Sequence, residues 1–146
     1  METKKAGCYL LNKSTKCIAL VFREKYNDYT FPKGHLEDNE TFIDCAIRET
    51  AEETKRIAKI VENIPPIEEF YSTKTGELCK CVMFVAIDGG QSDNQSTDTH
   101  PVVWTPIEEV SKKLSYESLR DSWNTIKSEI FKLLWFVLFL FTFYRV

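Results

Sequence analysis

Apolar residues gather in short runs near the start of the chain. The runs at 6–11 and 17–22 are each typical of a strand, and the polar segment 12–16 separates them. We therefore predict a hairpin formed by these two strands. A short apolar piece follows at 29–31, and residues 32–34 (Pro-Lys-Gly) then interrupt regular structure, so we expect a loop there.

A helix is expected to begin at Thr41. The Thr41 hydroxyl is suited to cap a free backbone amide, and Asp44 stands at the reciprocal position three residues later. Four residues recur at the i, i+3, i+4 and i+7 spacing of a helix face that packs on a core: Ile43, Ala46, Ile47 and Thr50. We expect this face to lie against the rest of the domain, with acidic residues on the opposite side.

The second half of the chain repeats the strand pattern and then turns helical. Two runs at 67–72 and 78–87 predict another hairpin, and the polar segment 88–100 is typical of a flexible loop. A strand is expected at 102–104. From Glu108 onward the pattern predicts one long helix that continues into the apolar end of the chain.

Length and composition favour a single folded domain. The chain has 146 residues, of which 43% are hydrophobic and 28% charged, and compact domains most often contain roughly 100 to 150 residues. The formal net charge is only −3, so no global basic field is available to attract duplex nucleic acid. Any nucleotide partner must therefore be held locally.

The five cysteines are odd in number, and the chain does not open with a basic and then apolar signal segment. We therefore expect reduced thiols and a cytoplasmic location.

The apolar run 133–144 is the least usual part of the sequence. Twelve helical residues extend ~18 Å, whereas a bilayer core is ~30 Å thick, so we expect no membrane span. Three roles stay open for the run: packing on the domain, contact with a membrane or a second subunit, or little native role. We divide the chain into a domain at 1–132 and an apolar tail at 133–146.

Three carboxylates follow one another on the expected helix at positions that share one side: Glu49, Glu52 and Glu53. Like charges at this spacing repel, and Lys55 and Arg56 come only after the cluster. A divalent cation such as Mg²⁺ would remove the repulsion, because it binds carboxylate oxygens. A solvated acidic helix face is the alternative explanation of the same pattern.

The spacing around the cluster resembles the signature of the Nudix hydrolases. Gly34 is followed by Glu40, by the pair Arg48-Glu49 and by the pair Glu52-Glu53 at the separations found in that family. The resemblance implies an α/β (α+β) fold in which a mixed central sheet lies between helices and carries a catalytic loop-helix-loop.

Three positions depart from the family pattern. Lys55 stands where the family usually has a glycine that ends the helix in the left-handed conformation, so we expect a different or extended helix end. Arg56 stands where the family usually has an aliphatic residue, and Ile57 is expected to supply the missing apolar contact. Asn39 also replaces a common glycine, and asparagine is the next best residue for such a turn.

The resemblance also implies roles for individual residues. Mg²⁺, with Mn²⁺ as an alternative, would be held by the carbonyl of Gly34 and by Glu49, Glu52 and Glu53. Arg48 and Glu40 belong to the same catalytic motif, where a mainly structural role is expected because an Arg fork can fix a carboxylate. The general base stays open between Glu52, Glu53 and Asp98 on the later loop.

The residues before the helix bear on the substrate. The segment 31–37 resembles that of diadenosine-polyphosphate hydrolases and of diphosphoinositol-polyphosphate phosphohydrolases. Lys33 is placed to neutralise an additional phosphate, His35 is a further candidate for phosphate contact, and Tyr71 is the candidate for stacking on a base. For each of the three, an ordinary surface or strand residue is the alternative.

Three functions stay open at this point. The first is asymmetric cleavage of a dinucleoside polyphosphate such as diadenosine tetraphosphate. The second is another Nudix activity, on diphosphoinositol polyphosphates, RNA 5′ ends, ADP-ribose or damaged nucleotides. The third is a catalytically silent module that binds nucleotides or proteins. A small-molecule nucleotide is thus the expected partner, and the exact substrate, the number of metal ions and the oligomeric state are not predicted.

Overall fold

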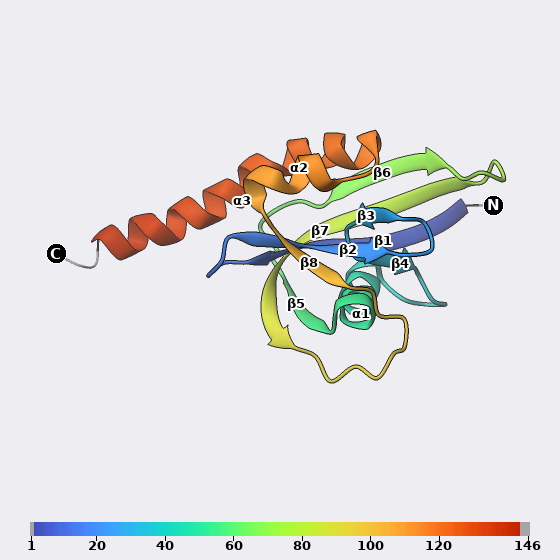
Figure 1. Ribbon diagram of the computed structural model, residues 1–146, viewed down its shortest axis with the longest axis horizontal. Coiled ribbons are helices and arrows are strands. Elements are labelled where there is room, and N and C mark those ends of the chain that lie inside the picture. The colour runs from blue at the N-terminus through green and yellow to red at the C-terminus, as the bar shows by residue number, and fades with distance from the viewer. Residues whose placement is uncertain (1, 144–146) are drawn as a thin grey trace.

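A mixed sheet between helices forms the domain. The computed structural model describes the backbone of residues 2–143 and the side chains of residues 2–134. Its elements are β1 (Glu2–Asn12), β2 (Cys17–Arg23), β3 (Asp28–Thr30), β4 (Lys33–His35), α1 (Phe42–Thr54), β5 (Arg56–Ile60), β6 (Ile67–Ser72), β7 (Leu78–Gln91), β8 (Val102–Pro106), a 3₁₀ turn η1 (Ile107–Glu109), α2 (Val110–Lys113) and α3 (Glu117–Phe143). Figure 1 shows α1 on one face of the sheet and α2 with α3 on the other.

The sheet is built around the parallel pair β1 and β7. These strands are in register from Glu2 opposite Leu78 to Leu11 opposite Ile87, and every other described strand pair is antiparallel. The strand order is β3-β2-β1-β7-β5, and β4, β6 and β8 pair with β1, β7 and β2 respectively. The expected mixed central sheet between helices is therefore confirmed.

Both predicted hairpins are present, but two short strands were not expected. β1 meets β2 with Leu11 opposite Ile18, and β6 meets β7 with Ser72 opposite Leu78. Where a loop was predicted after residue 31, β4 pairs with β1. This pairing depends on Gly7, because a Cβ at that position would lie 2.2 Å from the carbonyl oxygen of Pro32.

The loop predicted at 88–100 begins later than expected, because β7 continues to Gln91 and pairs there with β5, a strand that was not predicted. At this edge Arg56 forms a two-pronged ion pair with Asp88, with N–O distances of 3.0 and 2.7 Å. Because both residues of the pair are charged, the strand does not show the apolar alternation by which strands are predicted from sequence.

Helix α1 begins as predicted, since the Thr41 hydroxyl accepts a hydrogen bond of 3.1 Å from the Asp44 amide. Its predicted core face is partly wrong, because Ile43 is 42% exposed. The face that is buried is rotated toward the carboxylates and consists of Cys45, Ala46, Glu49, Thr50, Glu53 and Thr54. The acidic cluster therefore borders the core instead of lying on the opposite, solvated side.

The end of α1 also differs from expectation. The helix ends at Thr54, and Lys55 itself adopts the left-handed conformation with φ of +60°, its amide donating to the carbonyl of Ala51. A lysine thus makes the usual left-handed helix end, and no extended end is needed. Ile57 is 41% exposed and belongs to neither of the buried apolar clusters. Asn39 adopts a φ of +64°, as predicted for its turn.

The single long helix predicted from Glu108 is broken. The 3₁₀ turn η1 and the short α2 come first, Leu114 is extended, and α3 starts only at Glu117. Leu114 is buried at this break, and the hydroxyl of Ser115 accepts a hydrogen bond of 3.0 Å from the Tyr29 amide. These tertiary contacts turn the chain, and local helix periodicity cannot reveal them.

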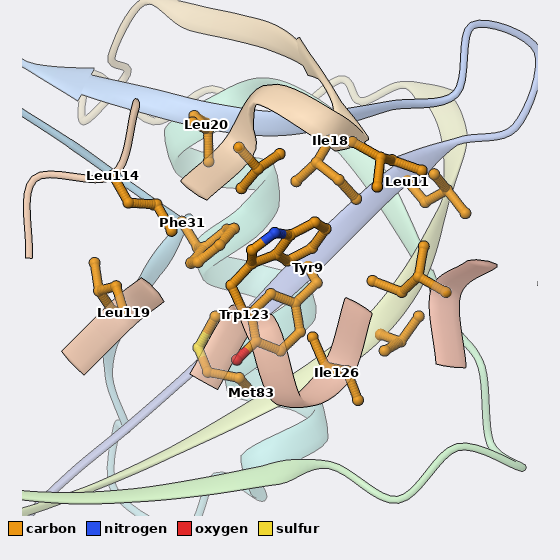
Figure 2. Packing of buried hydrophobic residues seen from close by; sticks show 14 of the residues in the cluster. Tyr9, Leu11, Ile18, Leu20, Phe31, Met83, Leu114, Leu119, Trp123 and Ile126 are labelled. Atoms are coloured by element: carbon orange, nitrogen blue, oxygen red, sulfur yellow. The ribbon is translucent and has the colours of Figure 1, made fainter. Parts of the chain in front are cut away.

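The larger core lies between the sheet and α3. Trp123 is fully buried there, and its ring centroid lies 6.2 Å from that of Tyr9 and 6.0 Å from that of Phe31. Figure 2 shows these three rings surrounded by aliphatic side chains of β1, β2 and the helices. A second cluster of buried residues packs α1 on the other face of the sheet. The sheet is thereby fixed on both sides, and α1 is held in a defined position.

The predicted tail can be followed only in part. α3 continues without a break through residue 133 to Phe143, so the backbone of the apolar run is helical as far as that residue. Leu133 packs against the larger core and Leu134 is buried in it. The side chains of 135–144, on which the three alternatives for the tail depend, lie outside the described residues. Within the described part of the chain, no helix is long and apolar enough to cross a membrane.

Candidate active site

The site begins where β4 meets α1. Gly34 lies against the side chain of Glu49, and a Cβ added to Gly34 would come within 2.1 Å of the Glu49 carboxyl carbon. Any side chain at Gly34 would therefore push the Glu49 side chain of α1 away from β4. The Gly34 carbonyl oxygen accepts a hydrogen bond of 3.5 Å from the thiol of Cys45.

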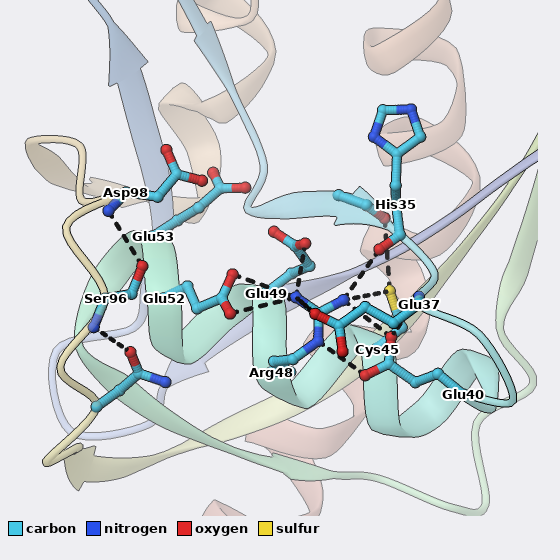
Figure 3. Close-up of polar contacts among 12 residues, drawn as sticks. His35, Glu37, Glu40, Cys45, Arg48, Glu49, Glu52, Glu53, Ser96 and Asp98 are labelled. Atoms are coloured by element: carbon cyan, nitrogen blue, oxygen red, sulfur yellow. Dashed lines mark hydrogen bonds and ion pairs between the residues drawn. The ribbon is translucent and has the colours of Figure 1, made fainter.

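Arg48 connects most of the acidic residues of the motif. Its guanidinium donates two hydrogen bonds to Glu40, at 2.7 and 2.8 Å, and further bonds of 2.9 Å to Glu49 and 3.2 Å to Glu52. It also donates to the backbone carbonyl of His35 at 2.9 Å. Figure 3 shows this fan of contacts, which joins the loop before α1 to the helix itself.

The contacts of Arg48 have clear electrostatic consequences. The Arg48 guanidinium lowers the pKa of the Glu40 carboxyl to about 2, and Glu40 in turn raises the pKa of Arg48. Both groups are therefore charged at all ordinary pH values. The geometry agrees with a structural role for Arg48 and Glu40, and a direct part in catalysis stays a prediction.

Three acidic side chains converge beside Arg48. Glu49 and Glu52 of α1 and Asp98 of the loop before β8 each offer an oxygen, and these atoms lie within 4.8 Å of one another. Asp98 is 46 residues from Glu52 in the sequence, and Figure 3 shows that the loop runs alongside the C-terminal half of α1. Three hard oxygen donors at this separation fit a divalent cation of the Mg²⁺ type.

Glu53 lies deeper than the other carboxylates. Its side chain is buried and accepts a hydrogen bond of 3.3 Å from the backbone amide of Lys33. Burial raises the pKa of Glu53 to about 8, and the charges of Glu49 and Asp98 contribute to the rise. Burial likewise raises the pKa of Glu49. Burial thus disfavours the charged form of these carboxyls, and a bound cation would stabilise that form, which supports the donor set as a metal site.

A cavity of about 400 Å³ opens above these carboxylates. Glu49, Glu53 and Asp98 are among its lining residues. The lining also includes positively charged or ionisable basic groups, namely Lys5, Arg23, Lys25, Lys33, His35 and His100. A cavity that combines metal-type carboxylates with several cations can accommodate the phosphates of a metal-bound polyanion.

A second cavity of about 450 Å³ adjoins the first, and the two share Lys5, Arg23, Thr30 and Lys33. Tyr71 and Tyr116 line the second cavity. The ammonium groups of Lys5 and Lys33 lie 5.8 and 5.9 Å from the centre of the Tyr71 ring. The shared cations thus connect the acidic cluster with an aromatic region.

Arg23 is held in this shared wall by a small network. The carboxylate of Asp28 accepts two hydrogen bonds from Arg23, of 2.8 and 2.6 Å, and one of 2.6 Å from the Tyr116 hydroxyl. Asp28 is buried, and Arg23 lowers its pKa. Arg23 is therefore a fixed cation at the junction of the two cavities.

The structure brings the predicted substrate residues to this region in different ways. Lys33 lines both cavities, His35 lines the first, and Tyr71 lines the second. Partial burial of the His35 ring and the nearby charge of Lys5 lower the pKa of His35. Contact of any of the three with substrate stays a prediction.

Sequence reasoning did not identify Lys5, Arg23 or His100 as members of the site. Lys5 lies within β1 and Arg23 ends β2, and a single charged residue on a strand carries no signal of function. His100 follows the polar loop, and its backbone amide donates to the carbonyl of Glu53 at 3.1 Å. These residues meet only because the sheet brings distant segments together.

Comparison with known proteins now decides the family. The family model described as the NUDIX domain matches residues 1–126. The chain belongs to the Nudix family. The expected assignment to the Nudix hydrolases and their fold is therefore confirmed at the level of the family.

One curated protein is similar in sequence over part of the chain. A protein of Mycobacterium tuberculosis described as the mutator protein MutT4 is 31% identical over 94 residues, which span 63% of this chain. The match covers 38% of the length of that relative.

Solved Nudix structures cover the chain more completely. The structure of the C. elegans Ap4A hydrolase in a binary complex is similar, with a TM-score of 0.73 and 25% identity over 90% of this chain and 98% of that one. A Nudix-family hydrolase from Clostridium perfringens has a TM-score of 0.71 at 12% identity, over 89% of this chain and 97% of that one, and shows the fold alone.

The raised pKa of Glu53 predicts a pH dependence of stability in the metal-free protein. Because the pKa in the folded state is about 8 and that of an unfolded glutamate ~4.3, folding disfavours the charged form. Stability should thus fall by roughly 3 kcal/mol between pH 5 and pH 8 in the presence of a chelator. Glu53→Gln should remove most of that fall, as measured by urea unfolding across this pH range. Parallel pH profiles for the variant and the wild type would contradict this account of Glu53.

Proposed function

We propose that this Nudix chain is a Mg²⁺-dependent hydrolase that cleaves a phosphoanhydride bond in a dinucleoside polyphosphate such as diadenosine tetraphosphate, in an asymmetric manner. The observation that carries the proposal is the continuity of the two cavities. Carboxylates of the acidic cluster line the first cavity, Tyr71 and Tyr116 line the second, and the cations Lys5, Arg23 and Lys33 line both. A nucleotide with a long phosphate chain offers matching groups, namely phosphates for the metal site and the cations and a base for the aromatic side chains.

The metal would be held by the converging oxygens of Glu49, Glu52 and Asp98, with Glu53 and the Gly34 carbonyl beside them. When bound there, Mg²⁺ would supply Lewis-acid stabilisation of the phosphoanhydride oxygens. Mn²⁺ prefers the same oxygen-rich surroundings and is the alternative ion. Arg48 would keep Glu49 and Glu52 in place in either case.

The side chains of the cavities would bind and orient the substrate. Lys33, Lys5 and Arg23 would neutralise successive phosphates, since they line the wall between the acidic cluster and the second cavity. Tyr71 would offer its ring to a base. The proton of the attacking water would pass to a carboxylate oxygen of Glu52, Glu53 or Asp98, all of which border the acidic cluster.

The substrate choice is supported by one of the structural relatives. The C. elegans Ap4A hydrolase is similar over almost the whole of both chains. The mutator relative from Mycobacterium tuberculosis favours a second candidate, hydrolysis of a damaged nucleotide, although it is matched over little more than a third of its length. Diphosphoinositol polyphosphates, RNA 5′ ends and ADP-ribose belong with this broader alternative.

A catalytically silent nucleotide-binding module is the remaining alternative. Such a module has no need of buried, mutually repelling carboxylates, because their desolvation reduces stability unless a cation offsets it. The raised pKa values of Glu49 and Glu53 mark such a cost in this chain. An active enzyme therefore explains the cluster better.

The proposal is tested by measuring phosphate-releasing activity on dinucleoside polyphosphates, inositol pyrophosphates, ADP-ribose and nucleoside triphosphates with Mg²⁺. Diadenosine tetraphosphate should have the highest kcat/KM and should yield ATP and AMP. Glu52→Gln should lower kcat about 100-fold or more, since it removes charge at the reacting phosphates. Glu62→Gln, an exposed residue after β5, is the matched control and should retain wild-type activity. A preference for another substrate would overturn the specific assignment, and full activity of Glu52→Gln would overturn the metal site.

Lys33→Ala tests the contact with the phosphate chain. If the ammonium meets a phosphate that only long substrates possess, kcat/KM should fall about 10-fold more for diadenosine tetraphosphate than for ADP-ribose, since a charge-assisted hydrogen bond contributes ~1.5 to 3 kcal/mol. Lys13→Ala, in the exposed turn between β1 and β2, controls for the loss of one positive charge. Equal losses for both substrates would assign Lys33 a structural role.

A further inference from the structure

The loop that carries Asp98 is fastened to the C-terminal end of α1. The Ser92 amide donates to the carbonyl of Lys55 at 2.9 Å, the Thr99 hydroxyl to that of Glu52 at 3.3 Å and the His100 amide to that of Glu53 at 3.1 Å. These bonds hold the two ends of the loop. None of these three bonds involves the middle of the loop, residues 93–98.

Lys55 contacts the middle of this loop. Its ammonium donates to the carbonyl of Asn94 at 2.9 Å and also to the carbonyl of Ser96. Ser96 is tied in turn to its neighbours, because its amide donates to the Asn94 side chain at 2.8 Å and its hydroxyl accepts from the Asp98 amide at 3.1 Å. Figure 3 shows Ser96 and Asp98 in this arrangement next to Glu52 and Glu53. A continuous chain of hydrogen bonds therefore leads from Lys55 to Asp98.

We propose that Lys55 is a positioning residue, which fixes the loop so that Asp98 completes the acidic cluster formed by Glu49 and Glu52. This inference rests on the proposed function only in taking the cluster as a metal site. Lysine near a helix end often acts on the carbonyls of that helix. Here the ammonium donates to carbonyls of the loop instead, and it therefore fixes the loop backbone that carries Asp98.

The position also requires an unusual backbone conformation. Lys55 has a φ of +60°, a region in which glycine is far less strained than lysine. Lys55→Gly should therefore preserve or increase the stability of the fold while removing the ammonium. Lys55→Met removes the ammonium and keeps the length of the side chain. The two variants separate the effect of the loop contact from that of the backbone.

The test uses the full chain and the metal alone. Mn²⁺ binding, followed by electron paramagnetic resonance, should weaken about 10-fold in Lys55→Met and in Lys55→Gly, the size of effect usual for groups that orient metal ligands. Amide hydrogen exchange at 94–98 should accelerate in both variants. Lys55→Arg should bind Mn²⁺ almost as tightly as the wild type because it keeps a charged donor. Lys13→Met should bind Mn²⁺ as the wild type does.

A double-mutant cycle shows whether Lys55 acts through Asp98. In an Asp98→Asn background, Lys55→Met should cause little further loss of Mn²⁺ affinity, because the oxygen that Lys55 positions is already altered. An equal loss in both backgrounds, or wild-type affinity in Lys55→Met, would overturn the proposal. Neither readout needs a substrate, so absence of polyphosphate hydrolysis would count against the proposed function and leave this test intact.

Discussion

The concentration of carboxylates on one side of α1 is the constraint on which the rest of the site depends. Glu49 and Glu53 are buried at positions where ionised groups are costly, and Glu52 and Asp98 lie beside them. The protein offsets part of this cost with Arg48, which bonds Glu49 and Glu52 of this cluster and is itself anchored by Glu40. The repulsion and desolvation that Arg48 does not offset are the electrostatic basis for binding a divalent cation.

The sheet turns this local arrangement into a site for a long polyanion. Gly34 allows β4 to approach Glu49, and the same strand carries Lys33 to the border between the cavities. Asp28 and Tyr116 fix Arg23 in the same wall. Arg23 is thus held in place by its bonds to Asp28 before a substrate arrives. A preorganised cation of this kind binds phosphate without the cost of ordering a flexible side chain.

Those parts of the fold and site that depend on local sequence could be predicted. The Thr41 cap, the two hairpins and the grouping of carboxylates on one helix follow from short-range spacing. The face of α1 could not be predicted correctly, because Ile43 is displaced from the core by a face that includes two buried glutamates. Asp98, Lys5 and Arg23 join the site through sheet pairing and loop contacts over long separations. The break before α3 likewise depends on the burial of Leu114.

The most direct test of the metal-site account is thermal unfolding as a function of Mg²⁺ concentration. A ligand that binds only the folded state at 100 times its Kd adds ~2.7 kcal/mol of stability, so the Tm should rise by about 5 °C or more relative to the protein in chelator. Glu49→Gln should largely abolish the rise, because it removes a ligand from the centre of the cluster. A wild-type Tm that is the same in chelator and in saturating Mg²⁺ would contradict the account.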